Sequence, residues 1–333
     1  MSENLNSNQH ANLNSNLHSD LNKNSYKKTV AFLGPLGTYS YLAAKDIFEE
    51  SDSKQISTQV STQATVDYIA LPSILDVFKK VQSGEVNVGV VPIENSIEGM
   101  VKDTINLFLD QSLLSMGASV QNKEVIIIKE YTLDIDHSLL SKGLYMQDIK
   151  VVHAHPQALG QCKHWLDTHL PRVNTVSENS NTSAVKILDE SGRDAIIASR
   201  KVAKEYQLNV LAEHISDKQN NKTLFYVITQ NTNNFFQKET LAQDIERHVR
   251  ENMAKKIIFL LEADNKMGIL RDLLSIFAIH SASVMRVQSL PTGELGTYYF
   301  LVDVDISKSL EYIRAIYTEL ASQCINVRVL GVV

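Results

Sequence analysis

The chain has 333 residues, 44% of them apolar, so it can form about two domains with buried cores. Its formal net charge of −6 argues against nucleic acid as the main partner, and no apolar run approaches the length of a membrane span. The two cysteines, Cys162 and Cys324, are far apart and lack metal-ligand spacing, which favours a reducing cytoplasm as the location.

Residues 1–27 are rich in asparagine and serine, and the pentapeptide NLNSN occurs at 4–8 and again at 12–16. The segment has neither an apolar signal core nor the arginine-rich amphipathic pattern of a transit peptide. We therefore expect a disordered tail.

In residues 28–230, short apolar strands alternate with segments of helical periodicity, as in the βαβ units of an α/β protein. Strands are expected at 28–34, 87–93, 123–131, 149–154, 194–199 and 223–229, and helices at 41–50, 74–83, 101–109, 157–170, 182–190 and 200–206. Polar clusters come from both ends of this region, so we expect two lobes around a cleft. The expected crossings between the lobes lie near 102–110 and 193–199, so that Thr223 returns to face Glu94.

Residues 231–254 are polar and are interpreted as a linker to a C-terminal domain at 255–333. The expected order there is strand 255–263, helix 268–280, strands 283–289 and 297–305, helix 310–322 and strand 325–333. This βαββαβ order predicts a ferredoxin-like unit, a four-stranded antiparallel sheet with two helices on one face. Such a unit has edges available for pairing, so we expect at least a homodimer.

A cluster of polar residues follows the apolar strand that ends near Pro92, where Glu94, Asn95 and Ser96 precede a helical segment. Polar groups at the carboxyl end of a strand mark the ligand crevice of an open α/β sheet. Together these side chains donate and accept hydrogen bonds, which suits a small polar ligand better than a metal. The alternative is a structural turn in which Asn95 or Ser96 caps the helix.

Four further turns carry hydroxyl or amide groups. They lie at 34–40 with Thr38, at 155–157, at 179–184 with Thr182 and Ser183, and at 221–225 with Thr223 and Phe225. Each turn alone is explained by capping, but their number in one α/β region favours a binding site.

At these turns the chain resembles the prephenate dehydratase family. Five motifs appear in the family's order: GPLGTYS at 34–40, VPIENS at 91–96, HPQAL at 155–159, NTSA at 181–184 and N-x-T-x-F at 221–225. The C-terminal domain resembles the ACT regulatory domain, with GILR at 268–271 for the usual Gly-Ala-Leu-Val and QSLP at 288–291 for the usual Glu-Ser-Arg-Pro.

The resemblance implies a two-lobed domain of the periplasmic-binding-protein type that converts prephenate to phenylpyruvate in phenylalanine biosynthesis. Aromatisation drives this reaction, so no cofactor or metal is expected. Thr223 is implied as the catalytic residue. The implied substrate-binding residues are Thr38, Glu94, Asn95, Ser96, Thr182, Ser183 and Phe225. L-Phenylalanine is implied as an effector at Gly268, Ile269, Leu270, Gln288 and Ser289, between the chains of a homodimer or homotetramer.

Two departures from the family pattern leave alternatives open. Leu224 replaces an arginine of the last motif, which weakens substrate binding if that arginine contacts substrate and removes an ion pair if it is structural. Lys222 is on the same strand face as Leu224 and could supply the charge. Leu290 and Gln288 replace an arginine and a glutamate in the C-terminal domain. The competing functions are an arogenate dehydratase and a non-catalytic ligand-binding protein that retains the fold.

Overall fold

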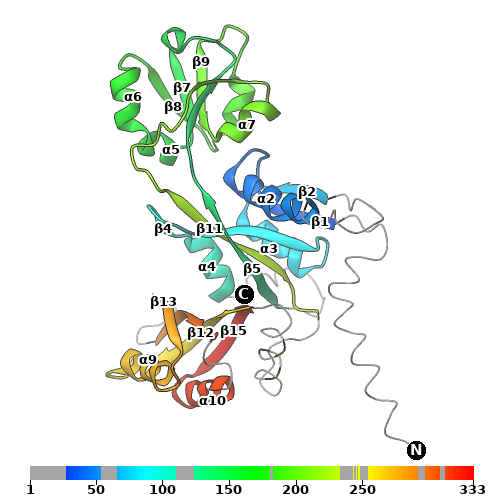
Figure 1. Ribbon diagram of the computed structural model, residues 1–333, viewed down its shortest axis with the longest axis vertical. Helices are drawn as coiled ribbons and strands as arrows, with labels where there is room; N and C mark the ends of the chain where they lie inside the picture. Colours follow the sequence, from blue (N-terminus) through cyan, green and yellow to red (C-terminus); the bar gives the residue numbers. More distant parts are fainter. Residues whose placement is uncertain are drawn as a thin grey trace, which may run out of the picture.

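The computed structural model describes residues 28–53, 66–109, 124–180, 183–232, 243, 245, 247, 254–291, 297–307 and 312–333. The expected tail at 1–27 and most of the expected linker at 231–254 lie outside these residues. The described chain forms two sheets and is elongated, with the second sheet at one end and the C-terminal domain at the other (Figure 1). None of the described helices is long and apolar enough to cross a membrane.

The first lobe is built on five strands in the order β5-β11-β3-β1-β2. They are β1 (Lys28–Leu33), β2 (Val66–Leu71), β3 (Val88–Asn95), β5 (Val125–Asp134) and β11 (Lys222–Gln230), with the short β4 (Gly99–Met100) paired to β3. The helices α2 (Tyr39–Ser53), α3 (Ile74–Gln82) and α4 (Lys102–Leu109) cover the sheet. Alternate strand residues face opposite sides, so the sheet has two separate apolar cores, one against α2 and one against α3 and α4.

The second lobe has a five-stranded sheet in the order β10-β6-β9-β7-β8. Its strands are β6 (Ser138–Ser141), β7 (Val151–Ala154), β8 (Asn174–Ser177), β9 (Asp194–Ala198) and β10 (Asn209–Ala212). Its helices are α5 (Pro156–Gln161), α6 (Lys163–His169) and α7 (Arg200–Glu205), with the 3₁₀ turns η2 (Met146–Asp148) and η3 (Ser183–Ile187).

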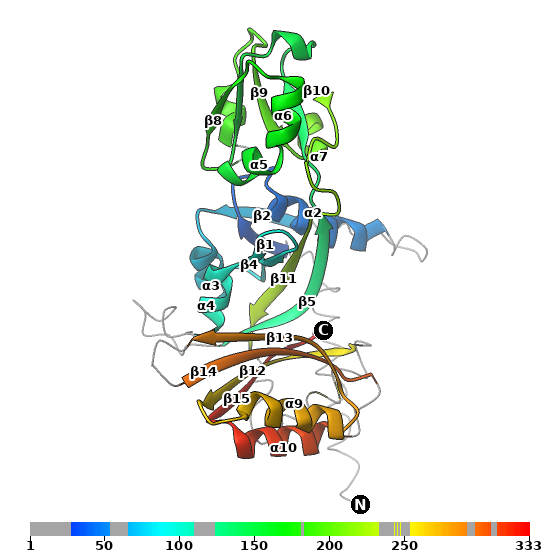
Figure 2. The same ribbon diagram turned by 90° about the vertical axis from the view of Figure 1, so that its left-hand side faces the viewer.

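The chain passes between the lobes at residues 135–137 and 213–221, which differs from the expected crossings. Residues 102–109 instead form α4 in the first lobe, and 194–198 form β9 inside the second. The reason is that β5 and β11 are long antiparallel partners that run together toward the second lobe, as Figure 2 shows. The first lobe is discontinuous in sequence, as expected.

The C-terminal domain has the expected βαββαβ order. It comprises β12 (Lys256–Asp264), α9 (Ile269–Ile279), β13 (Ser283–Pro291), β14 (Thr297–Asp305), α10 (Ile313–Gln323) and β15 (Asn326–Val332). The strand order is β13-β14-β12-β15 with antiparallel neighbours, and both helices pack on one face of this sheet.

The C-terminal domain adjoins the first lobe in two ways. Strand β15 pairs with β5 at Gly331 and Ile127, so one ten-stranded sheet runs through both domains. The helix-free face of the C-terminal sheet packs against α4 (Figure 2), where Leu260 and Leu301 join the same apolar core as Phe108. The strand that leads to the second lobe is therefore also the strand that contacts the C-terminal domain.

Candidate active site at the start of strand β11

The centre of the site is the place where the end of β3 pairs with the start of β11. Asn95 is the register partner of Thr223, and Glu94 is the partner of Leu224. The Asn95 Nδ2 atom lies 2.9 Å from Thr223 Oγ1, across 128 positions of sequence. The expected return of Thr223 to the turn at 94–96 is therefore present in the fold.

The side chain of Asn95 is held in one orientation by its own turn. Its Oδ1 atom accepts hydrogen bonds from the backbone N–H groups of Ile97, at 2.9 Å, and Glu98, at 3.0 Å. The amide nitrogen must then point the other way, where it donates to Thr223 Oγ1 at 2.9 Å and to Asn221 Oδ1 at 2.8 Å. The side chain is buried, so these bonds form with little competition from water.

The orientation of Asn95 fixes what Thr223 can do. Because the Thr223 hydroxyl oxygen accepts a hydrogen bond from Asn95 Nδ2, its own O–H proton points elsewhere. Among the residues that the structure describes, none accepts this proton. Thr223 is buried, so its hydroxyl is a positioned donor for a ligand atom placed beside it.

Ser96 joins the two strands. Its hydroxyl accepts a hydrogen bond from the Lys222 N–H at 2.9 Å, and its own N–H donates to the Lys222 carbonyl at 2.8 Å. These bonds set the distance between the turn after β3 and the start of β11. Within the described residues, Ser96 therefore positions its neighbours.

Glu94 differs from the expectation, because it does not face Thr223. Side chains that are register partners lie on the same face, so Glu94 shares a face with Leu224, and Asn95 shares the opposite face with Thr223. The Glu94 Oε2 atom lies 2.9 Å from Nη1 of Arg286 on β13. Consecutive polar residues at the end of a strand thus serve opposite faces of the sheet.

The neighbours of Thr223 on β11 are structural. Phe225 is 1% exposed and belongs to the core between the sheet and α2. Its side chain is therefore buried in that core, where it is not accessible for the predicted contact with substrate. Leu224 packs in the opposite core, against the C-terminal domain. The Lys222 ammonium pairs with Asp134 at 3.1 Å, so in this structure it is directed to that carboxylate.

Thr38 caps the start of α2. Its hydroxyl lies 3.0 Å from the carbonyl oxygens of Leu33 and Pro35, and it accepts from the Tyr41 N–H at 3.3 Å. The preceding Gly37 has φ of 80°, a left-handed conformation that favours glycine. The hydrogen bonds of the Thr38 hydroxyl are therefore made within its own turn.

The second lobe contributes a residue that was absent from the sequence-based site. Gln161, at the end of α5, accepts from Asn221 Nδ2 at 3.2 Å and lies 3.0 Å from His137 Nε2. Its amide nitrogen donates to Glu98 Oε1 of the first lobe at 3.2 Å. The signal in the sequence was its place two residues after the HPQAL motif, but only the fold shows that it contacts Asn221.

His137 and Tyr39 complete this polar chain at the crossing between the lobes. The Tyr39 hydroxyl donates to the Asp136 carbonyl at 2.6 Å and lies 2.9 Å from His137 Nδ1. Burial lowers the pKa of His137, which favours the neutral ring at pH 7. Burial likewise raises the pKa of Tyr39, so its phenol stays protonated. A continuous set of neutral polar groups therefore runs from the crossing to Thr223.

The remaining expected residues lie elsewhere. Thr182 is outside the described residues. Ser183 begins η3, and its hydroxyl donates to the Ser180 carbonyl at 2.8 Å, so it closes its own turn. No group of three or more His, Cys, Asp or Glu among the described residues could hold a metal ion.

The expected effector residues form two places in the C-terminal domain. Gly268 has φ of 81° and precedes α9, which begins with the buried Ile269 and the partly exposed Leu270. Gln288 and Ser289 lie in β13, and the Gln288 amide donates to the Ser289 carbonyl at 3.2 Å. Strand β13 is one of the two edge strands of the sheet, so Gln288 and Ser289 lie at a sheet edge.

Comparison with known proteins shows which family the chain resembles. A family model described as prephenate dehydratase matches residues 30–233. The chain is 35% identical over 284 residues to a prephenate dehydratase from Methanocaldococcus jannaschii, which covers 84% of this chain and 89% of that protein.

Two solved structures of prephenate dehydratases resemble this fold over most of the chain. The crystal structure of prephenate dehydratase from Arthrobacter aurescens in complex with L-Phe is 27% identical, has a TM-score of 0.69, and covers 91% of this chain and 89% of that one. The enzyme from Staphylococcus aureus is 25% identical with a TM-score of 0.68, covering 91% and 99%. The chain belongs to the prephenate dehydratase family.

Proposed function

We propose that the site around Thr223 converts prephenate to phenylpyruvate by decarboxylation and loss of water. The observation that carries this proposal is the hydrogen bond from Asn95 to Thr223. It leaves the Thr223 O–H as a donor with a fixed direction, which a departing hydroxyl group requires.

The reaction needs little from the protein beyond positioning. The bond between the ring and its carboxylate breaks, its electron pair enters the ring as CO₂ leaves, and the ring hydroxyl departs with its own bonding pair. The ring becomes aromatic, and the released hydroxide takes a proton to become water. A threonine hydroxyl is a weak acid, so Thr223 stabilises the departing oxygen by a hydrogen bond that strengthens as negative charge develops there.

The two carboxylates of prephenate must be held by other groups. The turn before α2 and the start of η3 at Ser183 are the candidates, because backbone N–H groups at a helix start favour anions. Gln161 and Asn221 support the orientation of Asn95 from the second lobe. Substrate bound between the lobes would then meet Thr223 in the orientation that the hydrogen-bond chain fixes.

The decisive experiment incubates the purified protein with prephenate and measures phenylpyruvate, with arogenate as the comparison substrate. Formation of phenylpyruvate supports the proposal. Phenylalanine formed faster from arogenate would instead indicate the amino analogue as substrate. Binding of prephenate without turnover would indicate a ligand-binding protein.

Thr223→Val tests the assigned residue, because valine has nearly the shape of threonine and no hydroxyl. We expect kcat to fall by roughly a hundredfold or more, since a bond to the leaving group acts mainly in the transition state. Thr223→Ser is the matched control, because it retains a hydroxyl and should retain most of the activity. A folded Thr223→Val protein with wild-type turnover contradicts the role.

We further propose that the C-terminal domain is an ACT-type regulatory domain that binds L-phenylalanine and joins the chains of a homodimer or homotetramer. Its βαββαβ order and its open edge at β13 support this, as does the L-Phe complex of the Arthrobacter aurescens relative. Both cysteines are free thiols, which supports a cytoplasmic location.

A further inference from the structure

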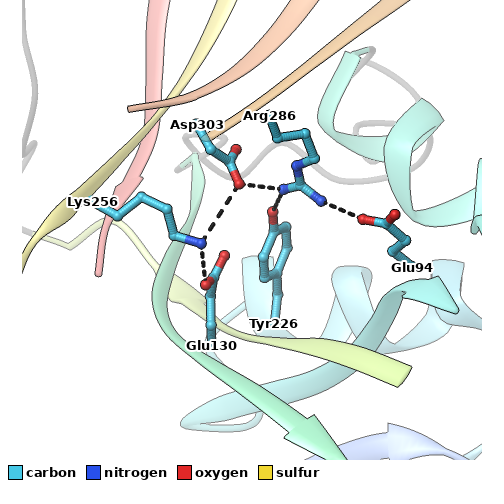
Figure 3. A network of polar contacts seen from close by, with 6 residues as sticks. All are labelled: Glu94, Glu130, Tyr226, Lys256, Arg286 and Asp303. Carbon is cyan, nitrogen blue, oxygen red and sulfur yellow. Dashed lines mark hydrogen bonds and ion pairs between the residues drawn. The ribbon is translucent and has the colours of Figure 1, made fainter. Parts of the chain in front are cut away.

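Arg286 lies at the centre of a network of polar contacts between the C-terminal domain and the first lobe (Figure 3). Its Nη1 atom pairs with Glu94 Oε2 at 2.9 Å, and its Nη2 atom pairs with Asp303 Oδ2 at 2.8 Å. Nη2 also donates to the hydroxyl of Tyr226. Lys256 contacts Asp303, at 3.6 Å, and pairs closely with Glu130.

One guanidinium group therefore contacts both strands that carry the site. Glu94 is in β3, directly before Asn95, and Tyr226 is in β11, three residues after Thr223. Both side chains project from the face opposite Thr223, toward the C-terminal domain. Arg286 thus connects β3 to β11 on the sheet face opposite Asn95 and Thr223, close to the place where these two residues form their hydrogen bond.

The local backbone of β13 aims Arg286 at this place. The register of β13 against β14 shifts between Val284 and Arg286, so Met285 has no partner in the pairing. A β-bulge of this kind redirects the following side chain. Arg286 is then the cross-strand partner of Asp303, which fixes one side of the guanidinium within its own sheet.

The network is poorly arranged for stability alone. It has three carboxylates for two cations, and Arg286 Nε, Glu130 Oε1 and Asp303 Oδ1 are buried without hydrogen-bond partners among the described residues. Buried ion pairs with unsatisfied atoms are often no better for stability than apolar packing. Its arrangement is instead suited to holding specific groups in one geometry.

We propose that Arg286 is a positioning residue for the dehydratase reaction: it fixes Glu94 and Tyr226 so that Asn95 and Thr223 meet in productive geometry. This inference rests on the proposed function for its kinetic consequence. The proposal also gives strand β13 a role in positioning the active site. The expected effector residues Gln288 and Ser289 lie in the same strand, two and three residues after Arg286.

Arg286→Lys is the sharpest test, because it keeps the buried charge and so avoids leaving three carboxylates beside one cation. A single ammonium cannot reproduce the planar fork that reaches Glu94, Asp303 and Tyr226 together. We expect kcat to fall roughly ten- to hundredfold with KM within about twofold, because a small misplacement affects the transition state more than ground-state binding.

Arg328→Lys is the matched control. Arg328 also bridges the two domains, because its Nη1 atom donates to the Phe108 carbonyl at 2.8 Å, but within the described part of the chain it makes no side-chain hydrogen bond to β3 or β11. We expect its kcat to stay at the wild-type value. An equal loss of kcat in both variants would show a general loosening of the domain contact and would overturn the proposal, as would a wild-type kcat in Arg286→Lys.

Tyr226→Phe tests the β11 side of the contact. It removes the phenol hydroxyl that Arg286 Nη2 contacts and leaves Glu94 in place. We expect a smaller fall in kcat than in Arg286→Lys, and no further fall when the two changes are combined. Fully additive effects would mean that Arg286 and Tyr226 act separately, which contradicts a shared positioning role.

Hydrogen–deuterium exchange provides a readout besides activity. The Ile97 and Glu98 N–H groups bond to Asn95 Oδ1, so they report the order of the turn. The peptide that contains these two N–H groups should exchange deuterium faster in Arg286→Lys than in the wild type, and at the wild-type rate in Arg328→Lys. If the wild-type protein forms no phenylpyruvate, the proposed function fails, but the exchange result still decides whether Arg286 orders the turn. An unchanged exchange rate in Arg286→Lys overturns the positioning role of Arg286.

Discussion

At the scale of single residues, three consecutive polar side chains do three different things. Glu94 turns toward the C-terminal domain, Asn95 orients Thr223, and Ser96 joins the turn to the start of β11. The sequence could predict that these residues cluster at a strand end. It could not predict which face each one serves, because that depends on the register with β11 and on the bulge between Leu224 and Phe225.

Asn95→Asp tests the direction of the hydrogen bond to Thr223. A carboxylate can still accept from the Ile97 and Glu98 N–H groups, so the turn is kept. It has no proton to donate to Thr223, whose O–H would then turn to donate to the carboxylate. We expect kcat to fall by roughly a hundredfold, and the combination with Thr223→Val to be little worse than either change alone. Steady-state kinetics of the three variants check this, and wild-type kcat in Asn95→Asp contradicts it.

Leu224→Arg tests what the missing arginine of the family motif would contact. Leu224 faces away from Thr223 and is the register partner of Glu94. An arginine there would compete with Arg286 for Glu94 and would not reach substrate beside Thr223. We therefore expect KM for prephenate to stay within about twofold of the wild type, and kcat to fall if the Arg286 contact is displaced. Several-fold tighter binding of prephenate would instead place this side chain at the substrate.

At the scale of elements, the sequence was most informative where strands are buried and helices are periodic. The expected strand at 297–305 matches β14, and the expected helix at 268–280 encloses α9. Strand β8, by contrast, is exposed along its whole length and has no apolar pattern to detect. The expected helix at 182–190 is the short 3₁₀ turn η3 within the described residues, because its capping serines signal a turn without setting its length.

The lobe crossings show a second limit of the sequence. Helical and strand patterns mark elements, but they do not say which sheet a strand joins. Strands β5 and β11 pair along nearly their full lengths, and that long-range pairing sets the crossings at 135–137 and 213–221. Gln161 was missed as a site residue for the same reason, since its contact with Asn221 depends on where α5 is placed.

Gly331→Ala tests the junction between the two domains. Gly331 is the residue at which β15 pairs with β5, and a Cβ there would collide with the Ile127 backbone carbonyl. A rigid backbone neighbour cannot move aside as a flexible side chain would. We expect the free energy of unfolding to fall by about 1–3 kcal/mol, measured by urea denaturation. Gly160→Ala is the matched control, because a Cβ at Gly160 meets no heavy atom within 4 Å. Equal stability of the two variants would contradict a close junction.

At the scale of the whole molecule, a single sheet connects the C-terminal domain to the strands of the site. Strand β15 contacts β5, β5 pairs with β11, and β11 carries Thr223. One edge of that sheet is β13, which also supplies Arg286 and the expected effector residues Gln288 and Ser289. In the proposed oligomer, a ligand that changes how β13 contacts another chain would act on the strand that also carries Arg286.

L-Phenylalanine should bind to the proposed oligomer and lower its activity. An effector shifts activity only through its difference in affinity for two arrangements, typically about 1–3 kcal/mol. With Gln288 and Leu290 in place of the glutamate and arginine of the family motif, we expect inhibition near the lower end, about fivefold at saturation. Calorimetry and activity assays at millimolar L-phenylalanine check this, with D-phenylalanine as the control and light scattering to give the oligomeric state. Binding without inhibition would uncouple β13 from the site, and neither binding nor inhibition would leave the C-terminal domain with assembly as its role.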